Sequence, residues 1–127
     1  MIKVILDTNF LVYCAKQKID YKECIDSIMK EGYEMVVPFQ VVLELEDLEK
    51  NAKKFSDRQA AKLAIKLLEA NKIKIIKTKG KYADETILSL AKGNIVATLD
   101  LVLREKLKRL GYCRIIVIKN IRKIAFD

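Results

Sequence analysis

The chain has 127 residues, of which 51% are hydrophobic and 33% charged, with one proline and four glycines. This composition is typical of one folded α/β domain over residues 1–127 and excludes a disordered or low-complexity protein. A net charge of +8 favours a polyanionic partner, and nucleic acid is the leading candidate. No apolar run reaches the roughly 20 residues of a membrane span, so we expect a cytoplasmic protein.

Short strands rich in valine and isoleucine alternate with helices along the chain. The sequence predicts strands at about 2–6, 34–38, 73–77, 94–99 and 114–118. It predicts helices at roughly 9–16, 21–31, 40–50, 57–71, 82–92 and 101–110, with residues 121–126 as an edge strand or a packed tail. This alternation predicts a central, mainly parallel, twisted sheet of about five strands with helices on both faces.

Two of the predicted strands lead into aspartates. Asp7 follows the first strand, and Asp100 follows the strand at 94–99. Open parallel sheets bind ligands outside the carboxyl ends of their strands, so both carboxylates are expected at that edge. Each aspartate also has a purely structural explanation, because Asp7 suits an Asx turn and Asp100 suits a helix N-terminus.

Two further acids fall beside apolar helix faces. Asp84 lies within the apolar stripe of the helix at 82–92, and Glu44 borders the stripe of the helix at 40–50. A buried ionised carboxylate is costly unless a cation or metal matches it. Helix capping for Asp84 and an ion pair with lysine for Glu44 are the alternatives. Both helices follow strands, so both acids reach the edge where the aspartates at the strand ends lie.

Four acids at one edge of a sheet predict a site for a divalent cation, because clustered carboxylates repel one another unless a cation intervenes. Oxygen ligands favour Mg²⁺ or Mn²⁺ over zinc. The chain has no histidine and no glycine-rich phosphate loop, which removes histidine-dependent catalysis and nucleotide cradles. Hydrolysis of a phosphodiester by metal-activated water is what remains.

Three cysteines, Cys14, Cys24 and Cys113, are widely spaced and form no Cys-x-x-Cys pair. We interpret all three as small core hydrophobes, not as zinc ligands or disulfide partners. Asp57 is expected to cap the helix at 57–71, and Gly111 to end the helix at 101–110.

Four segments resemble PIN-domain ribonucleases: Ile5 to Leu11, the Glu44 helix, Tyr82 to Leu88, and Val96 to Asp100. The resemblance covers essentially the whole chain and is strongest to the branch that includes the ribosome-biogenesis endonuclease of the small-subunit processome. It implies a three-layer PIN-like fold and a metal-dependent endoribonuclease. The catalytic, metal-binding residues that it implies are Asp7, Glu44, Asp84 and Asp100.

The resemblance also implies supporting residues. Thr8, Asn9 and Thr98 match polar positions that orient the first acid, as outer partners of metal ligands commonly do, and Glu85 matches an accessory acid. The chain departs from the family at Leu99, where a polar residue is usual, and at Glu85, where this branch often has aspartate.

The family implies a substrate of single-stranded RNA or an exposed loop, with basic side chains that hold its phosphates. Tyr82 and Phe39 either stack on bases or pack in the core. The phosphate-binding candidates are Lys77, Lys79, Lys81 and Arg104, for which a solvated surface is the alternative. Three roles stay open: ribosomal RNA processing, a toxin ribonuclease of a toxin–antitoxin pair, and a non-catalytic RNA-binding scaffold. A homodimer and a protein partner that supplies specificity are also left open.

Overall fold

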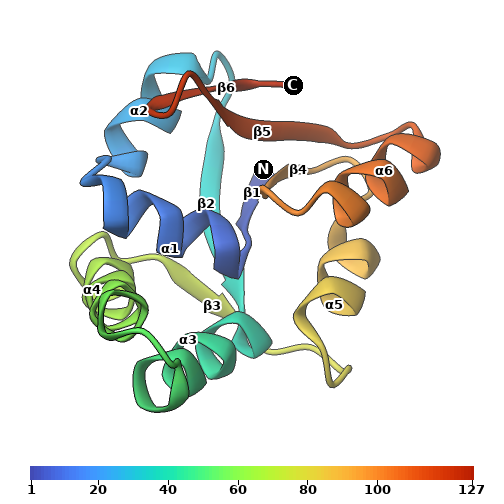
Figure 1. Cartoon of the computed structure of the whole chain (residues 1–127). Coiled ribbons are helices and arrows are strands. Elements are labelled where there is room, and N and C mark those ends of the chain that lie inside the picture. Colours follow the sequence, from blue (N-terminus) through green and yellow to red (C-terminus); the bar gives the residue numbers. More distant parts are fainter.

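The computed structural model describes all 127 residues and contains six strands and six helices (Figure 1). In chain order the elements are β1 (Ile2–Leu6), α1 (Thr8–Gln17), α2 (Tyr21–Ile28), β2 (Tyr33–Pro38), α3 (Phe39–Asn51), α4 (Phe55–Ala70), β3 (Lys74–Ile76), α5 (Ala83–Leu90), β4 (Ile95–Ala97), α6 (Leu101–Leu110), β5 (Arg114–Lys119) and β6 (Lys123–Phe126). The alternation of strands and helices predicted from the sequence is confirmed. No helix combines the length and the apolar character that a membrane span needs.

The strands form one sheet in the order β3-β2-β1-β4-β5-β6. Every neighbouring pair is parallel except β5 and β6, which are antiparallel. The predicted sheet of about five strands therefore has six, because the tail pairs with β5. Asn120 and Ile121 adopt left-handed backbone conformations with φ of 51° and 70°, and this tight turn folds the tail back along β5.

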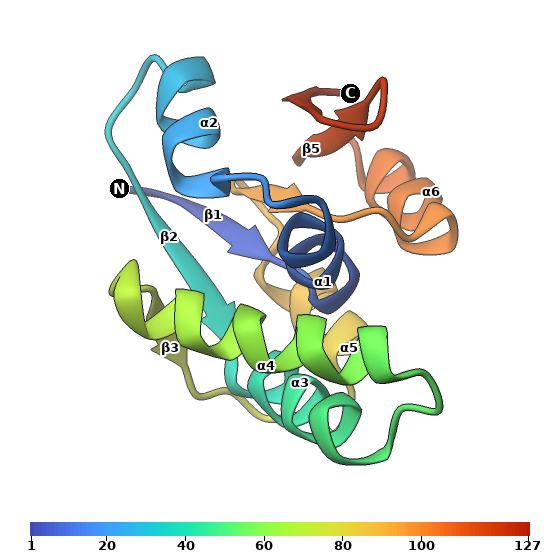
Figure 2. The same ribbon diagram turned by 60° about the vertical axis from the view of Figure 1, so that its left-hand side comes forward.

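Alternate residues of the central strand β1 enter two separate cores. Val4 and Leu6 belong to a cluster of 22 buried residues that includes side chains of α1, α2, α3 and α4. Ile5 belongs to a cluster of nine, with side chains of α5 and α6. Successive side chains of a strand point to opposite faces, so the run of apolar residues in β1 fills both cores. Figure 1 shows the resulting layers, with β1 and β2 between α1 and α4 on one side and α5 and α6 on the other. In Figure 2 the layer with α1 and α4 comes to the front.

Helix ends agree with the sequence at one position and differ at another. Gly111 ends α6 in the left-handed conformation, with φ of 75°, as expected. Asp57 does not cap α4, because this helix already begins at Phe55 with Lys54 in the capping position. Asp57 instead lies in the first turn and forms an ion pair with Lys16 of α1. The pair joins the two helices that cover the larger core.

The three cysteines occupy different environments. Cys14 is fully buried in the larger core, and burial raises the pKa of its thiol to about 12. Cys24 and Cys113 are only partly buried, so the prediction of three core cysteines holds for Cys14 alone. Cys24 belongs to the short helix α2, and Cys113 lies in the turn before β5, where neither side chain is fully covered.

Candidate active site

Four carboxylates line one cavity at the carboxyl edge of the sheet. Asp7 directly follows β1, Glu44 lies in α3 after β2, Asp84 lies in the first turn of α5, and Asp100 precedes α6. The cavity, which we call the carboxylate cavity, has a volume of about 550 Å³. It is lined by Asp7, Thr8, Asn9, Val12, Tyr13, Lys16, Glu44, Leu48, Ala83, Asp84, Leu99 and Asp100. The parallel topology thus brings together the four acids that the sequence places up to 93 positions apart.

The four acids differ in their exposure. Asp7 is buried, with 7% of its surface exposed, Asp100 is partly exposed, and Glu44 and Asp84 are exposed. The prediction that Asp84 sits within a buried apolar stripe is therefore wrong. Asp84 is the second residue of α5, where its carboxylate accepts a hydrogen bond from the amide of Glu85 at 3.0 Å. The positive end of the helix dipole stabilises a carboxylate at this position.

Both oxygens of Asp7 are held by neutral donors. Oδ1 accepts from the Thr8 amide at 2.8 Å, and Oδ2 accepts from the Thr98 hydroxyl at 2.6 Å. The Thr98 hydroxyl also accepts from the Asp100 amide at 3.1 Å, while Oδ1 of Asn9 accepts from the Leu99 amide at 3.1 Å. These contacts join the end of β1 to the segment between β4 and α6. They fix the rotamer of Asp7 against a rigid part of the fold.

Thr8 connects the first two acids. Its amide donates to Asp7, and its hydroxyl donates to Oε1 of Glu44 at 2.6 Å. Thr8 is itself buried, so its position is set by the packing of α1. One threonine therefore fixes the relative positions of carboxylates from β1 and α3.

Two of the acids also lie in helix-capping positions, a role that the sequence allowed for Asp100 but not for Asp7, where it allowed an Asx turn. Asp7 occupies the capping position of α1, and Asp100 caps α6 by accepting from the amides of Val102 and Leu103 at 2.9 and 3.1 Å. Capping uses only part of each carboxylate, which has two oxygens with two lone pairs each. Capping and a place in the cavity are thus compatible at both positions.

The electrostatics of Asp7 set it apart from ordinary surface acids. Burial raises the pKa of its carboxyl group above the usual value, and repulsion from Glu44 and Asp100 adds to this effect. The hydrogen bonds from Thr98 and Thr8 act in the opposite direction without reversing it. No side-chain cation of the chain pairs with Asp7. An ionised Asp7 is therefore short of positive charge.

The donor atoms suit a hydrated divalent cation. The acids surround the cavity, but no three of them converge into a ready-made metal-binding group. Mg²⁺ is commonly held by one or two carboxylates, keeps several of its waters and completes its shell with substrate phosphates. Oxygen donors and the uncompensated charge at Asp7 fit this mode of binding. They do not resemble an all-protein cage for zinc or calcium.

Several cavity residues were missed by the sequence analysis. Val12, Tyr13 and Lys16 come from α1, at spacings of three, four and seven residues from the predicted Asn9. This spacing describes one face of a helix, and it could have identified the wall of the cavity once Asn9 was chosen. Tyr13 is fixed there by its hydroxyl, which donates to the carbonyl of Ile121 at 2.8 Å.

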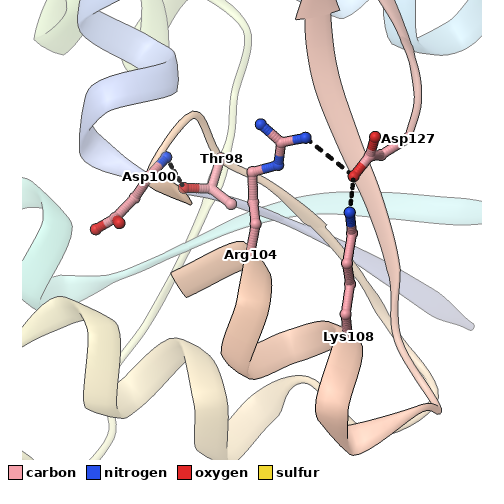
Figure 3. A network of polar contacts seen from close by, with 5 residues as sticks. All are labelled: Thr98, Asp100, Arg104, Lys108 and Asp127. Carbon is pink, nitrogen blue, oxygen red and sulfur yellow. Dashed lines mark hydrogen bonds and ion pairs between the residues drawn. The ribbon is translucent and has the colours of Figure 1, made fainter. Parts of the chain in front are cut away.

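The basic candidates fall into two groups. Lys77, Lys79 and Lys81 are exposed in the segment between β3 and α5 that leads to Asp84. Arg104 lies on α6 and donates to Asp127 at 3.0 Å, so its charge is matched within the chain (Figure 3). Neither Arg104 nor Glu85 lines the carboxylate cavity.

Comparison with known proteins identifies the family. A family model described as a PIN-like domain matches residues 4–121. The chain belongs to the PIN-like domain family. The resemblance found in the sequence is therefore confirmed, and so is the three-layer α/β fold that it implied.

Individual proteins resemble this PIN-like domain at different levels of sequence identity. Ribonuclease VapC4 of Methanocaldococcus jannaschii is 39% identical over 111 residues, which cover 84% of this chain and 83% of that protein. The structure of the PIN domain endonuclease Utp24 matches 98% of this chain and 90% of its own, with a TM-score of 0.79 and 25% identity. VapBC2 from Rickettsia felis, bound to a DNA fragment from its promoter, matches 94% of this chain and all of its own. Its TM-score of 0.59 and identity of 12% indicate a shared fold alone.

Proposed function

We propose that this PIN-like domain, over residues 1–127, is a metal-dependent endoribonuclease that hydrolyses RNA phosphodiester bonds with Mg²⁺ or Mn²⁺. The observation that carries the proposal is the carboxylate cavity, in which four acids from four junctions of the sheet face one space and none of them forms an ion pair with a lysine or arginine. The similarity to proteins named as a ribonuclease and as an endonuclease supports this chemistry. The net charge of +8 supports a polyanionic substrate.

The proposed ligands are Asp7, Glu44, Asp84 and Asp100. When bound, the metal supplies an activated water and stabilises charge on the leaving oxygen. Asp7 serves as the fixed acid, because hydrogen bonds from Thr8 and Thr98 hold both of its oxygens. Glu44 and Asp84 are exposed, so both are accessible to a phosphate that enters the cavity. Glu85, which does not line the cavity, is proposed only to add negative charge beside it.

The test is cleavage of a labelled, structured RNA by wild type and by Asp7→Asn, with Mg²⁺, with Mn²⁺ and with a chelator. Salt is kept constant, because the RNA affinity of a basic protein falls steeply as salt rises. We expect cleavage only with metal, and a fall of about 1000-fold or more in Asp7→Asn, as for the loss of a group that acts at the reacting atoms. RNA binding should persist in the variant.

Two results would contradict the proposal. An equal loss of binding and cleavage in Asp7→Asn would mean that Asp7 supports the fold or the RNA surface rather than hydrolysis. Binding without cleavage under any metal would favour a non-catalytic scaffold. In either case the carboxylate cavity would no longer be assigned to catalysis.

Two cellular roles are proposed for this activity. Ribosomal RNA processing is supported by the similarity to Utp24, and a toxin ribonuclease is supported by the higher identity to VapC4. Inducing wild type and Asp7→Asn in cells separates the two roles. Growth arrest by wild type alone favours the toxin, whereas an accumulation of ribosomal RNA precursors on depletion favours processing. A homodimer and a protein partner that supplies specificity stay predictions.

A further inference from the structure

A second cavity adjoins the carboxylate cavity. It has a volume of about 420 Å³ and is lined by Thr8, Gln40, Leu43, Glu44, Asp47, Leu48, Lys81 and Tyr82. Thr8, Glu44 and Leu48 line both cavities, so the two are continuous neighbours along α3. A group held in the second cavity would therefore lie directly beside the carboxylates.

The aromatic wall of this cavity is a ring on a fixed backbone. Tyr82 leaves 53% of its surface exposed, although large aromatic side chains are usually well buried. Its carbonyl accepts from both the amide and the hydroxyl of Thr86, at 3.3 and 3.1 Å, as the first turn of α5 begins. The ring thus faces solvent while its backbone is held by the helix. Such a ring suits stacking, because little freedom is lost on binding.

The loop before Tyr82 is held in place by α3. Nε2 of Gln40 donates to the carbonyls of Thr78 and Gly80 at 3.1 and 2.8 Å, which fixes the orientation of the amide. Gly80 has φ of 120°, a conformation that side-chain-bearing residues rarely adopt. Gln40 is 95% buried, and its amide oxygen has no hydrogen-bond partner. The buried Gln40 side chain therefore acts within the fold, where it fixes the loop that leads to Tyr82.

The charges around the cavity are mixed, because Glu44 and Asp47 line it and Lys81 is the only basic residue that does. Lys77, Lys79 and Lys81 are exposed along the same segment, and the Lys81 ammonium lies over one face of the Tyr82 ring, 5.5 Å from its centre, so a base would stack on the other face. Leu43, with 47% of its surface exposed, adds an apolar wall. An aromatic face beside an ammonium group matches the flat base and the phosphate of one nucleotide. A purely apolar protein segment would leave the lysines unmatched.

We propose that the second cavity binds an unpaired base of the RNA, next to the phosphate that enters the carboxylate cavity. Tyr82 is the stacking platform, Gln40 holds the loop that leads to it, and Lys81 contacts the neighbouring phosphate. This assignment rests on the proposed function, since it takes RNA as the substrate. A base within a duplex is stacked on both faces, so the cavity selects single-stranded sites.

The direct test uses Tyr82→Trp, because the chain has no tryptophan and the new side chain both preserves the platform and reports on it. The Asp7→Asn background prevents cleavage during titration. The matched control is Tyr112→Trp in the same background. Tyr112 is similarly exposed, at 45%, but lies just before β5, at the opposite edge of the sheet from the carboxylate cavity.

A short single-stranded oligoribonucleotide should quench the fluorescence of Tyr82→Trp, and the same strand in a duplex should not. Tyr112→Trp should respond to neither. Equal quenching by single strand and duplex, or no quenching of Tyr82→Trp by an oligoribonucleotide that binds, would overturn the base subsite. So would a failure to bind RNA at all.

A second measurement follows cleavage in the wild-type background. Tyr82→Ala should raise KM for a single-stranded substrate by about 5- to 150-fold, the range expected for the loss of one stacked base. Tyr82→Phe keeps the ring and should stay within about twofold of wild type. Wild-type KM in Tyr82→Ala would overturn the proposal. Quenching without metal-dependent cleavage would leave the subsite intact and remove the proposed nuclease, so the two failures are distinguishable.

Discussion

Two carboxylates, Asp127 beside α6 and Asp7 in the carboxylate cavity, have opposite surroundings. Asp127 lies 3.0 Å from both Arg104 and Lys108 (Figure 3). The hydrogen bond from Lys108, followed by the one from Arg104, holds the pKa of the Asp127 carboxyl group below its usual value. Asp7 has only neutral donors, and burial raises its pKa. The chain thus supplies its own cations where an acid fastens the C-terminal strand. It forms no ion pair with Asp7, where we propose that an external cation binds.

The largest expected effect comes from removing one negative charge, either from the carboxylate cavity at Asp100 or from the ion pairs of Asp127. Asp100→Asn should lower metal-dependent cleavage by about 1000-fold or more, whereas Asp127→Asn should stay within about twofold of wild type. Asparagine caps helices as well as aspartate does, so the first change keeps the cap of α6 and removes only the charge. Cleavage rates at matched protein and metal concentrations provide the measurement. Similar losses in both variants would show that the two carboxylates do not differ in function.

An intermediate effect is expected from the hydroxyl that supports Asp7. Thr98→Val keeps the shape of this fully buried side chain but removes the donor to Asp7 and the acceptor for the Asp100 amide. Loss of an outer partner of a metal ligand typically costs about 10- to 100-fold in activity or metal affinity, and we expect a loss in that range. Titration of activity with Mn²⁺ measures it.

Thr98→Ser is the control for this hydroxyl. Serine restores the donor without the methyl group and should recover most of the activity, although it leaves a small cavity. If Thr98→Ser is as impaired as Thr98→Val, packing rather than the hydrogen bond would explain the effect.

The smallest effects concern stability, and their signs are opposite. The pKa of Asp7 is raised in the folded protein, so ionisation of this carboxyl group opposes folding. The free energy of unfolding therefore falls as pH rises from the usual aspartate pKa through the raised pKa of Asp7. In a chelator at pH 7, Asp7→Asn should therefore raise Tm by a few degrees. At pH 3 the same change should have little effect. Thermal unfolding at both pH values tests the sign.

Asp127 provides the opposite case. Its lowered pKa means that its ionised form stabilises the fold, and this contribution is present above the usual aspartate pKa and lost as pH falls through the lowered value. Asp127→Asn should lower Tm at pH 7 by about 1–2 °C, because a partly exposed ion pair contributes little. Mn²⁺ should raise Tm of wild type and of Asp127→Asn but not of Asp7→Asn. A metal response in all three proteins would disconnect Asp7 from the cation.

Much of the fold was predictable because its signals are local. The apolar strands, Gly111 at the end of α6, and the acids after β1 and before α6 follow from residue type and spacing. Asp84 shows where such reasoning fails. Its spacing relative to Ile87 is that of a buried stripe, yet the start of α5 leaves it exposed. The exact rotation of a helix on its sheet depends on packing, which spacing does not encode.

The sequence by itself determined the element order, the two-faced parallel sheet and the acids that reach its carboxyl edge. Periodicity and strand ends are properties of neighbouring residues, so no distant contact was needed to find them. Tertiary structure alone decided which charges are matched. It joined Arg104 to Asp127, placed Thr98 on Asp7, and put Gln40 and Tyr82 around one cavity beside the acids. These relations join residues between 23 and 91 positions apart, and only the packed fold sets such contacts.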